Sequence, residues 1–400
     1  MAAPLTVNVM MLGGRRAGKT SALAAMQGCF DKEFKGTQLS ITPINSAALD
    51  AIEAKRQEME DYLAKASRNE PFVPGGEQTD REMTYRFNLK LKDRPDTIHL
   101  DFYDFPGEWL TAGDPNYDKV AERVKSSDVL IIIIDTPYLM EKDGQYNDVR
   151  NRCFRITQSI KAIEDLKTKI LPKLVLFVPI KCEKYCHEKR MLDVYKRIVS
   201  DRCYGGLVEY LKGSCEMAIT PIQTIGTAMF QGFDFNEATG DLRMGKDADG
   251  KEFPNKPLYY FTRRAEDAAL RQGLDRKYAA EPKDCEQLAV YTFYYVLTYA
   301  ATVARLKKEK NKKDFFGVMG AQIGEAALRL LKSLIPAPVR EFLPDEALNK
   351  LMKDLRDRFD FASAEDYLKQ RDLVFKKLKT SGDGYEIIYP DILNFKGEHK

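Results

Sequence analysis

The sequence predicts an α/β fold built on a doubly wound, mostly parallel sheet. Two short runs, residues 129–134 and 174–180, are continuously apolar, which is typical of strands covered on both faces. Amphipathic segments of helical period alternate with such runs, and this alternation favours a parallel sheet with helices on both sides. The chain has 400 residues, of which 44% are hydrophobic, so it can bury a core of this kind.

The individual elements follow from the spacing of apolar residues. Residues 83–91 alternate apolar and polar side chains, which predicts a half-buried strand, and residues 98–103 predict its hairpin partner. The amphipathic stretch 149–163 predicts a single helix. The expected strands are 7–12, 83–91, 98–103, 129–134, 174–180 and 217–222, and the expected helices are 21–30, 47–65, 149–163, 192–199 and 285–306.

Composition divides the chain into two parts. Residues 1–306 carry the alternation of strands and helices, interrupted at about 226–283 by a predicted insertion with a Gly-, Asp-, Lys- and Pro-rich surface loop. Residues 307–400 predict a helical C-terminal region. Its expected elements are charged amphipathic helices at 321–334, 345–358 and 364–379, and a short strand or strap at 385–395.

A glycine-rich motif lies between the first predicted strand and the first predicted helix. Residues 13–20 read GGRRAGKT, a pattern whose backbone N–H groups cradle di- and triphosphates at the start of a helix. Lys19 is expected to reach the β- and γ-phosphates, and the Thr20 hydroxyl to hold Mg²⁺. The residues expected to contact a nucleotide here are Gly13, Gly14, Arg15, Arg16, Ala17, Gly18, Lys19, Thr20 and Ser21.

A second motif ends the strand predicted at 98–103. Asp104 and Gly107 are spaced D-x-x-G, so the carboxylate can bind Mg²⁺ through water and the glycine N–H can contact a γ-phosphate. Loss of that phosphate would release the loop, which predicts a switch with two states. An ordinary turn built on Asp, Pro and Gly is the alternative interpretation.

The order of these parts resembles the translation-factor-like (TRAFAC) class of P-loop GTPases. The string DFPGEWL at residues 104–110 is more particular and resembles the YcjX-like GTPases and the bacterial double-GTPase group. The resemblance covers about residues 7–306. It implies a Ras-like P-loop sheet that binds GTP or GDP with Mg²⁺. A threonine before the second strand would then serve as the first switch residue and a metal ligand; Thr79 is expected there, with Thr84 or a plain loop threonine as alternatives.

The same resemblance implies a base-reading motif after the strand at 174–180. This class carries Asn/Thr-Lys-x-Asp there, and this chain has Ile180, Lys181, Cys182 and Glu183. Lys181 can lie along the base, and Glu183 can replace the aspartate that accepts hydrogen bonds from guanine. Because the Asn/Thr is absent, an ATPase or a promiscuous NTPase stays open as an alternative.

Catalysis is less clearly signalled than binding. Related enzymes place a water-orienting glutamine after the D-x-x-G glycine, where this chain has Glu108. The expected catalytic residues are Lys19, Glu108 and Arg16. Arg15 or Arg16 could stabilise transition-state charge from within the same chain. Simple solvent exposure or a salt bridge is the alternative for both arginines. We therefore expect slow hydrolysis aided by a partner or by dimerisation, and a non-hydrolysing, nucleotide-bound scaffold remains the third interpretation.

Charge and cysteine content narrow the choice of partners. A net charge of +3 favours neither nucleic acid nor membrane surfaces. Seven cysteines without a signal peptide favour a reducing cytoplasm.

The uncharged stretch 288–304 predicts a buried helix rather than a membrane span. A zinc set of Cys182, Cys186, His187 and Cys203 is disfavoured by its unusual spacing. The sequence thus predicts a Mg²⁺-dependent, GTP-binding switch with an unidentified protein effector.

Overall fold

The structure is a computed structural model of the chain, and it describes most of the first 315 residues and one later helix. The described residues are 5–30, 34–44, 46–65, 81–92, 97–111, 113–163, 173–246, 250–254, 256–274, 278–315 and 364–376. The helices expected at 321–334 and 345–358 and the segment expected at 385–395 lie outside them.

A seven-stranded sheet forms the centre of the molecule, in the order β2-β3-β4-β1-β5-β6-β7. Strands β4, β1, β5, β6 and β7 run parallel, whereas β3 pairs antiparallel with both β2 and β4. The predicted α/β class and the β3–β4 hairpin are therefore confirmed. The strands are β1 (Leu5–Leu12), β2 (Leu39–Pro43), β3 (Met83–Leu91), β4 (Thr97–Asp104), β5 (Val129–Asp135), β6 (Lys173–Ile180) and β7 (Cys215–Ile219).

Helices cover both faces of this sheet, which explains the continuous apolar runs. In β5, Ile131 and Ile133 belong to one core cluster, whereas Leu130 and Ile132 belong to the other. Side chains of alternate residues point to opposite faces, so a strand between two helical layers must be apolar throughout. One cluster includes α1 (Lys19–Gln27), α3 (Ser46–Lys65), α12 (Cys285–Phe315) and α16 (Ala364–Phe375); the other includes α4 (Tyr117–Ser126), α7 (Cys153–Lys161), α9 (Met191–Ser200) and α10 (Tyr204–Leu211).

The segment after β5 departs from its prediction. The single helix expected at 149–163 is two helices, α6 (Asn147–Asn151) and α7, separated by Arg152. Arg152 has a φ of 56°, a left-handed conformation that cannot continue a right-handed helix. The remaining short elements of this part are η1 (Gly107–Leu110), α5 (Thr136–Met140), η2 (Glu141–Gly144) and α8 (Glu183–His187).

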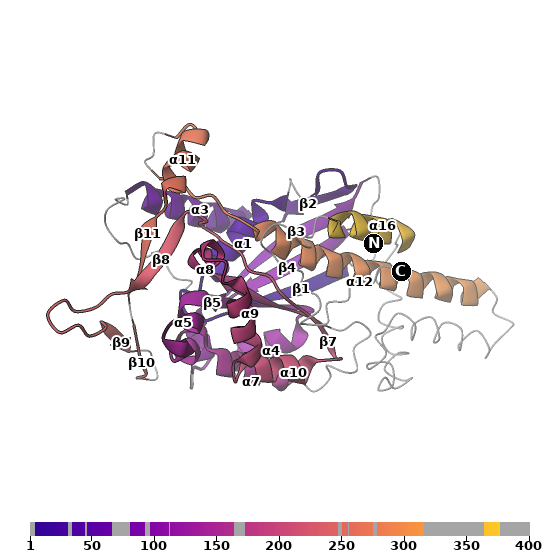
Figure 1. Ribbon diagram of the computed structural model, residues 1–400. Coiled ribbons are helices and arrows are strands. Elements are labelled where there is room, and N and C mark those ends of the chain that lie inside the picture. Colours follow the sequence, from indigo (N-terminus) through magenta and orange to yellow (C-terminus); the bar gives the residue numbers. More distant parts are fainter. Residues whose placement is uncertain are drawn as a thin grey trace.

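The stretch expected to be an insertion forms two small antiparallel sheets of two strands each, β8 with β11 and β9 with β10, beside the main sheet (Figure 1). The Tyr138 hydroxyl of α5 donates to the Pro254 carbonyl at 2.8 Å, and the ring of Tyr138 lies 5.1 Å from that of Phe233. Through α5, these two contacts attach the small sheets to the end of β5. Its elements are β8 (Ala228–Phe233), β9 (Met244–Lys246), β10 (Glu252–Pro254), β11 (Pro257–Phe261) and α11 (Arg263–Arg271).

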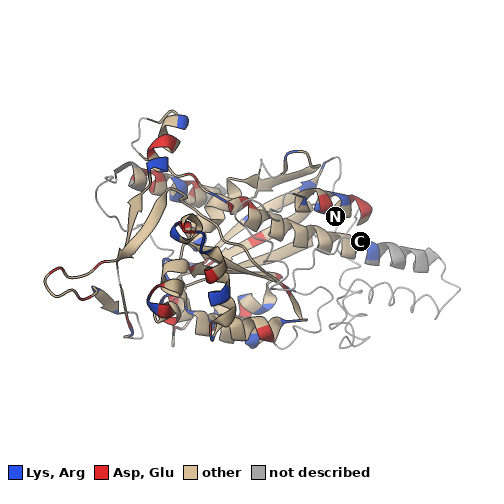
Figure 2. Ribbon diagram, in the orientation of Figure 1, with Lys and Arg blue, Asp and Glu red and all other residues tan. Residues whose placement is uncertain are grey.

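Helix α12 runs along one face of the sheet with α16 beside it (Figure 1). Its first part carries few charged residues, as Figure 2 shows, and most of its side chains there are buried. On α16, Gln370 accepts a hydrogen bond from the Gln38 backbone N–H at 2.8 Å. Among the described residues, no helix combines the length and apolarity needed to cross a bilayer. The division of the chain at residue 306 stays a prediction; α12 itself continues to Phe315.

Candidate functional site

The loop between β1 and α1 is held close to neighbouring backbone. A Cβ atom added at Gly14 would lie 1.8 Å from the carbonyl oxygen of Arg150 in α6. Gly18, the residue before α1, has a φ of 103°, and a Cβ there would lie 2.5 Å from a side-chain carbon of Ile180. Glycine is required at both positions because no other residue fits the space and the conformation. The packing of this loop therefore requires glycine at two of the positions where the sequence motif has it.

Lys19 is buried at the first position of α1, with its side chain turned back toward the loop. Its Nζ donates to the Gly13 carbonyl at 3.3 Å and lies 5.5 Å from the centre of the Phe105 ring. Burial lowers the pKa of the Lys19 amine, and the nearby carboxylates of Asp104 and Glu108 oppose that shift. A phosphate bound at the start of α1 would neutralise an ammonium in this position.

Thr20 and Asp104 meet at the junction of α1 and β4. The Thr20 hydroxyl donates to Asp104 Oδ2 at 2.5 Å, and the Asp104 side chain is fully buried. Hydroxyl and carboxylate oxygens are the ligands that Mg²⁺ prefers, so this pair fits the ion that the sequence predicts. Thr79, the expected third ligand, lies outside the described residues. Its alternative, Thr84, lies in β3 opposite Tyr103.

The segment after Asp104 packs directly on the phosphate loop. A Cβ at Gly107 would lie 2.3 Å from the backbone nitrogen of Arg15. Beside it, Glu108 pairs with Arg15, with 2.7 Å between Oε1 and Nε, and both side chains are partly exposed. Arg15 therefore takes the salt-bridge alternative in this structure. The side chain of Arg16 is exposed, and its φ of 56° is left-handed.

The remaining loop residues complete this picture. Ala17 is buried against the end of the sheet, and Ser21 is half-buried in the first turn of α1. The end of β5 was not predicted as part of the site. There the Asp135 N–H donates to Asn151 Oδ1 at 2.7 Å, and Asn151 Nδ2 donates back to the Asp135 carbonyl. Polar residues directly after a buried parallel strand were the available signal.

Lys181 joins the phosphate loop to the expected base-reading segment. Its Nζ donates to the Arg16 carbonyl at 3.1 Å and forms an ion pair with the carboxylate of Asp135. These two contacts lay the aliphatic stem across the end of the sheet. The sequence predicted Lys181 but not its partner Asp135.

Glu183 is buried in the first turn of α8. Its Oε1 accepts a hydrogen bond from the Gly226 backbone N–H at 3.1 Å. Burial raises the pKa of Glu183 to about 7, although backbone hydrogen bonds from Gly226 and Ile225 oppose the shift. The carboxylate thus fastens the loop that follows β7.

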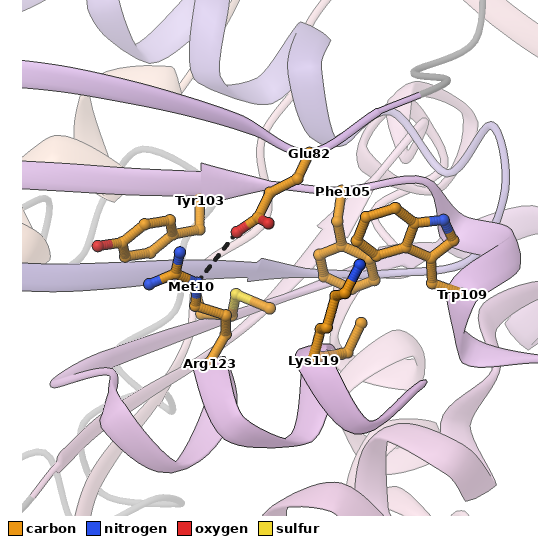
Figure 3. A pocket seen from close by; sticks show the side chains of 8 residues that line it. Met10, Glu82, Tyr103, Phe105, Trp109, Lys119 and Arg123 are labelled. Atoms are coloured by element: carbon orange, nitrogen blue, oxygen red, sulfur yellow. Dashed lines mark hydrogen bonds and ion pairs between the residues drawn. The ribbon is translucent and has the colours of Figure 1, made fainter. Parts of the chain in front are cut away.

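A small pocket opens beside the second motif, between the sheet and α4 (Figure 3). The ring of Trp109 lies on that of Phe105, with 6.4 Å between their centres, and Lys119 lies over Trp109. Arg123 pairs with Glu82 at 3.0 Å at the other end. Of these residues, Phe105 and Trp109 belong to the string at 104–110 that the sequence analysis singled out. The pocket is lined by Met10, Glu82, Tyr103, Phe105, Trp109, Lys119, Val120 and Arg123.

Comparison with known proteins agrees with this geometry. Residues 8–204 match the family model described as Double-GTPase 2. The predicted resemblance to the double-GTPase group is thereby confirmed, and the match supports GTP binding by this region.

Two solved structures were also found similar. Both are of the S. cerevisiae Ski7 GTPase-like domain, one bound to GTP and one to GDP and inorganic phosphate. Their sequence identities are 12% and 13% and their TM-scores 0.30 and 0.28. Each alignment covers 56% of this chain, which spans 43% and 44% of the two domains. No curated protein matches the chain significantly.

Proposed function

We propose that this chain is a Mg²⁺-dependent guanine-nucleotide switch that hydrolyses GTP slowly and acts through a protein partner. The observation that supports it most is the contact between Thr20 and Asp104. It joins the loop that would hold the phosphates to the segment that would sense them. Gly107 lies against the backbone of the same loop, so a third phosphate would have to be accommodated at that contact.

The site's own residues divide the work. Lys19 and the loop N–H groups would bind the phosphates, and Thr20 with Asp104 would hold Mg²⁺, which supplies charge neutralisation when bound. Thr79 is proposed as the further metal ligand. Lys181 would flank the base, and Glu183 would accept from the guanine N–H groups while it holds Gly226.

We propose that hydrolysis is slow because the Glu108 carboxylate forms an ion pair with Arg15. That ion pair keeps the carboxylate beside the loop, and a glutamate repels the γ-phosphate where related enzymes use a neutral glutamine. The same pair favours the second candidate function, a nucleotide-bound scaffold that does not hydrolyse. A partner that separates Arg15 from Glu108 would free Arg15 to stabilise transition-state charge.

A single-turnover experiment tests the enzymatic part. We expect purified protein to release phosphate from GTP when Mg²⁺ is present, and Lys19→Ala to abolish release because the buried ammonium is lost. Lys196→Ala, which removes an exposed lysine of α9, is the matched control and should behave as wild type. If wild type and Lys19→Ala release phosphate equally, the enzymatic proposal fails and the non-hydrolysing, nucleotide-bound scaffold remains.

Nucleotide identity is tested separately by competition. The protein should co-purify with GDP or GTP, identified by mass, and ATP should compete poorly for the site. Glu183→Gln should narrow the preference for GTP over ATP by about tenfold, since one charge-assisted hydrogen bond contributes roughly 1.5–3 kcal/mol. Equal affinity of the wild type for both nucleotides would instead support the promiscuous NTPase.

A further inference from the structure

Three side chains that can ligate a metal meet where α6, α7 and α10 converge. Asp148 lies in α6, Cys153 begins α7, and Cys203 directly precedes α10. Their ligand atoms all lie within 4.8 Å of one another, and Cys153 Sγ lies 3.6 Å from Asp148 Oδ1. Within the described part of the chain, this is the one group of three His, Cys, Asp or Glu side chains arranged in this way.

The spacing suits a tetrahedral ion. Zinc binds sulfur at about 2.3 Å and carboxylate oxygen at about 2.0–2.2 Å, and tetrahedral angles then separate a sulfur and an oxygen ligand by about 3.5 Å. The observed 3.6 Å between Cys153 Sγ and Asp148 Oδ1 agrees with that value. Cys203 and Asp148 are partly exposed, which leaves a path for the ion and room for a water ligand.

Neighbouring groups already hold these ligands in place. Asn147 Nδ2 lies 3.6 Å from Cys153 Sγ and donates to Asp201 Oδ2 at 3.1 Å. The other oxygen of Asp201 accepts the backbone N–H of Cys203 at 2.8 Å and fixes that residue at the start of α10. Donors to a ligating sulfur and fixed backbone around a ligand are the outer contacts that metal sites use.

We propose that Asp148, Cys153 and Cys203 form a binding site for a thiolate-preferring divalent cation such as Zn²⁺. Water supplies the fourth ligand. The two sulfur ligands select against Mg²⁺, so this site is chemically distinct from the oxygen ligands Thr20 and Asp104. The bound ion ties the α6–α7 junction to α10. Cys203, which the sequence placed with the disfavoured set around Cys182, belongs with Cys153 instead.

Cobalt titration tests the site directly. Full-length protein is reduced, stripped with a chelator, returned to excess Mg²⁺ and GDP, and titrated with Co²⁺. We expect a near-ultraviolet charge-transfer band from thiolate to cobalt that saturates at one ion per chain and that Zn²⁺ abolishes. Cobalt bound by Thr20 and Asp104 gives no such band, because those ligands are oxygen atoms.

Variants identify the ligands. Cys203→Ser should remove most of the band and weaken Zn²⁺ binding at least tenfold, and Asp148→Asn should weaken binding with the band retained. Cys29→Ser, which changes another half-buried cysteine, is the matched control. Zn²⁺ should also raise the melting temperature of wild type but not of Cys203→Ser. The proposal is overturned by a reduced, folded protein without the band, or by a band unchanged in Cys203→Ser.

Discussion

The proposed phosphate end and the proposed base end of the site are built by different means. At the phosphate end, closely packed glycine backbone and the buried Lys19 form the surface that a ligand would meet. At the base end, side chains make the connections, with Lys181 held by Asp135 and Glu183 held by Gly226. A surface made of backbone requires glycine at fixed positions, whereas one made of side chains can be assembled from varied residues. Only the first kind leaves a strict pattern in the sequence.

The largest effect should come from breaking the phosphate end at Gly14. In Gly14→Ala the new methyl group would overlap the Arg150 carbonyl oxygen, 1.8 Å away, and neither backbone can give way without displacing the loop. We expect GTP affinity to fall at least about 100-fold, which corresponds to roughly 3 kcal/mol, in an equilibrium titration with a fluorescent nucleotide.

Gly206→Ala provides the control for that substitution. Gly206 lies in α10, and the nearest atom to its added Cβ is the flexible end of Lys161 at 3.7 Å. A helical glycine replaced by alanine should raise the free energy of unfolding by roughly 0.5–1 kcal/mol and leave affinity unchanged. If Gly14→Ala binds GTP as tightly as Gly206→Ala does, backbone packing does not define the phosphate end.

A second prediction concerns the base end and pH. Burial raises the pKa of Glu183 from 4.5 to about 7. Between these values the folded protein retains a proton that the unfolded chain has released, so the free energy of unfolding falls as the pH rises through this window. Glu183→Gln lacks this dependence. Its free energy of unfolding, measured with urea, should therefore rise relative to that of wild type by up to about 3 kcal/mol between pH 4.5 and pH 7.5.

Glu209→Gln is the control for the pH experiment, because Glu209 is an exposed carboxylate of α10. Its unfolding should follow wild type at every pH. If the free energies of unfolding of wild type and Glu183→Gln change with pH in parallel, Glu183 is ionised in the folded protein. Burial at the base end would then not raise its pKa.

The smallest effect should come from the ion pair that joins the loop to the second motif. Arg15 and Glu108 are 49% and 30% exposed, and exposed pairs of this kind contribute about 0–1 kcal/mol. A double-mutant cycle with Arg15→Ala and Glu108→Ala should give a coupling energy below about 1 kcal/mol in unfolding. A much larger coupling would make this contact a structural part of the phosphate end.

The same contrast explains what could be predicted of the fold. Strands β5 and β6 were clear because burial on both faces demands unbroken apolar runs. Strand β2 was missed because it is short, lies at the sheet edge and has mostly exposed side chains. The break at Arg152 gave no signal, since neither glycine nor proline marks it; the conformation depends on tertiary contacts. Asp135 was missed although its place directly after a buried strand was a signal, and Gly226 was missed because its partner Glu183 is distant in sequence.

The contact between Gln38 and Gln370 has a consequence for how the protein is made. These residues are 332 positions apart, and Tyr294 of α12 packs against Phe375 of α16 with 5.1 Å between ring centres. At about 5–20 residues per second, a ribosome needs roughly 3–12 s to pass from Phe315 to Phe375. During that interval this flank of α12 has no α16 to cover it. Completion of this layer is therefore a late event of biosynthesis, and nascent chains halted before α16 are the ones that should need a chaperone.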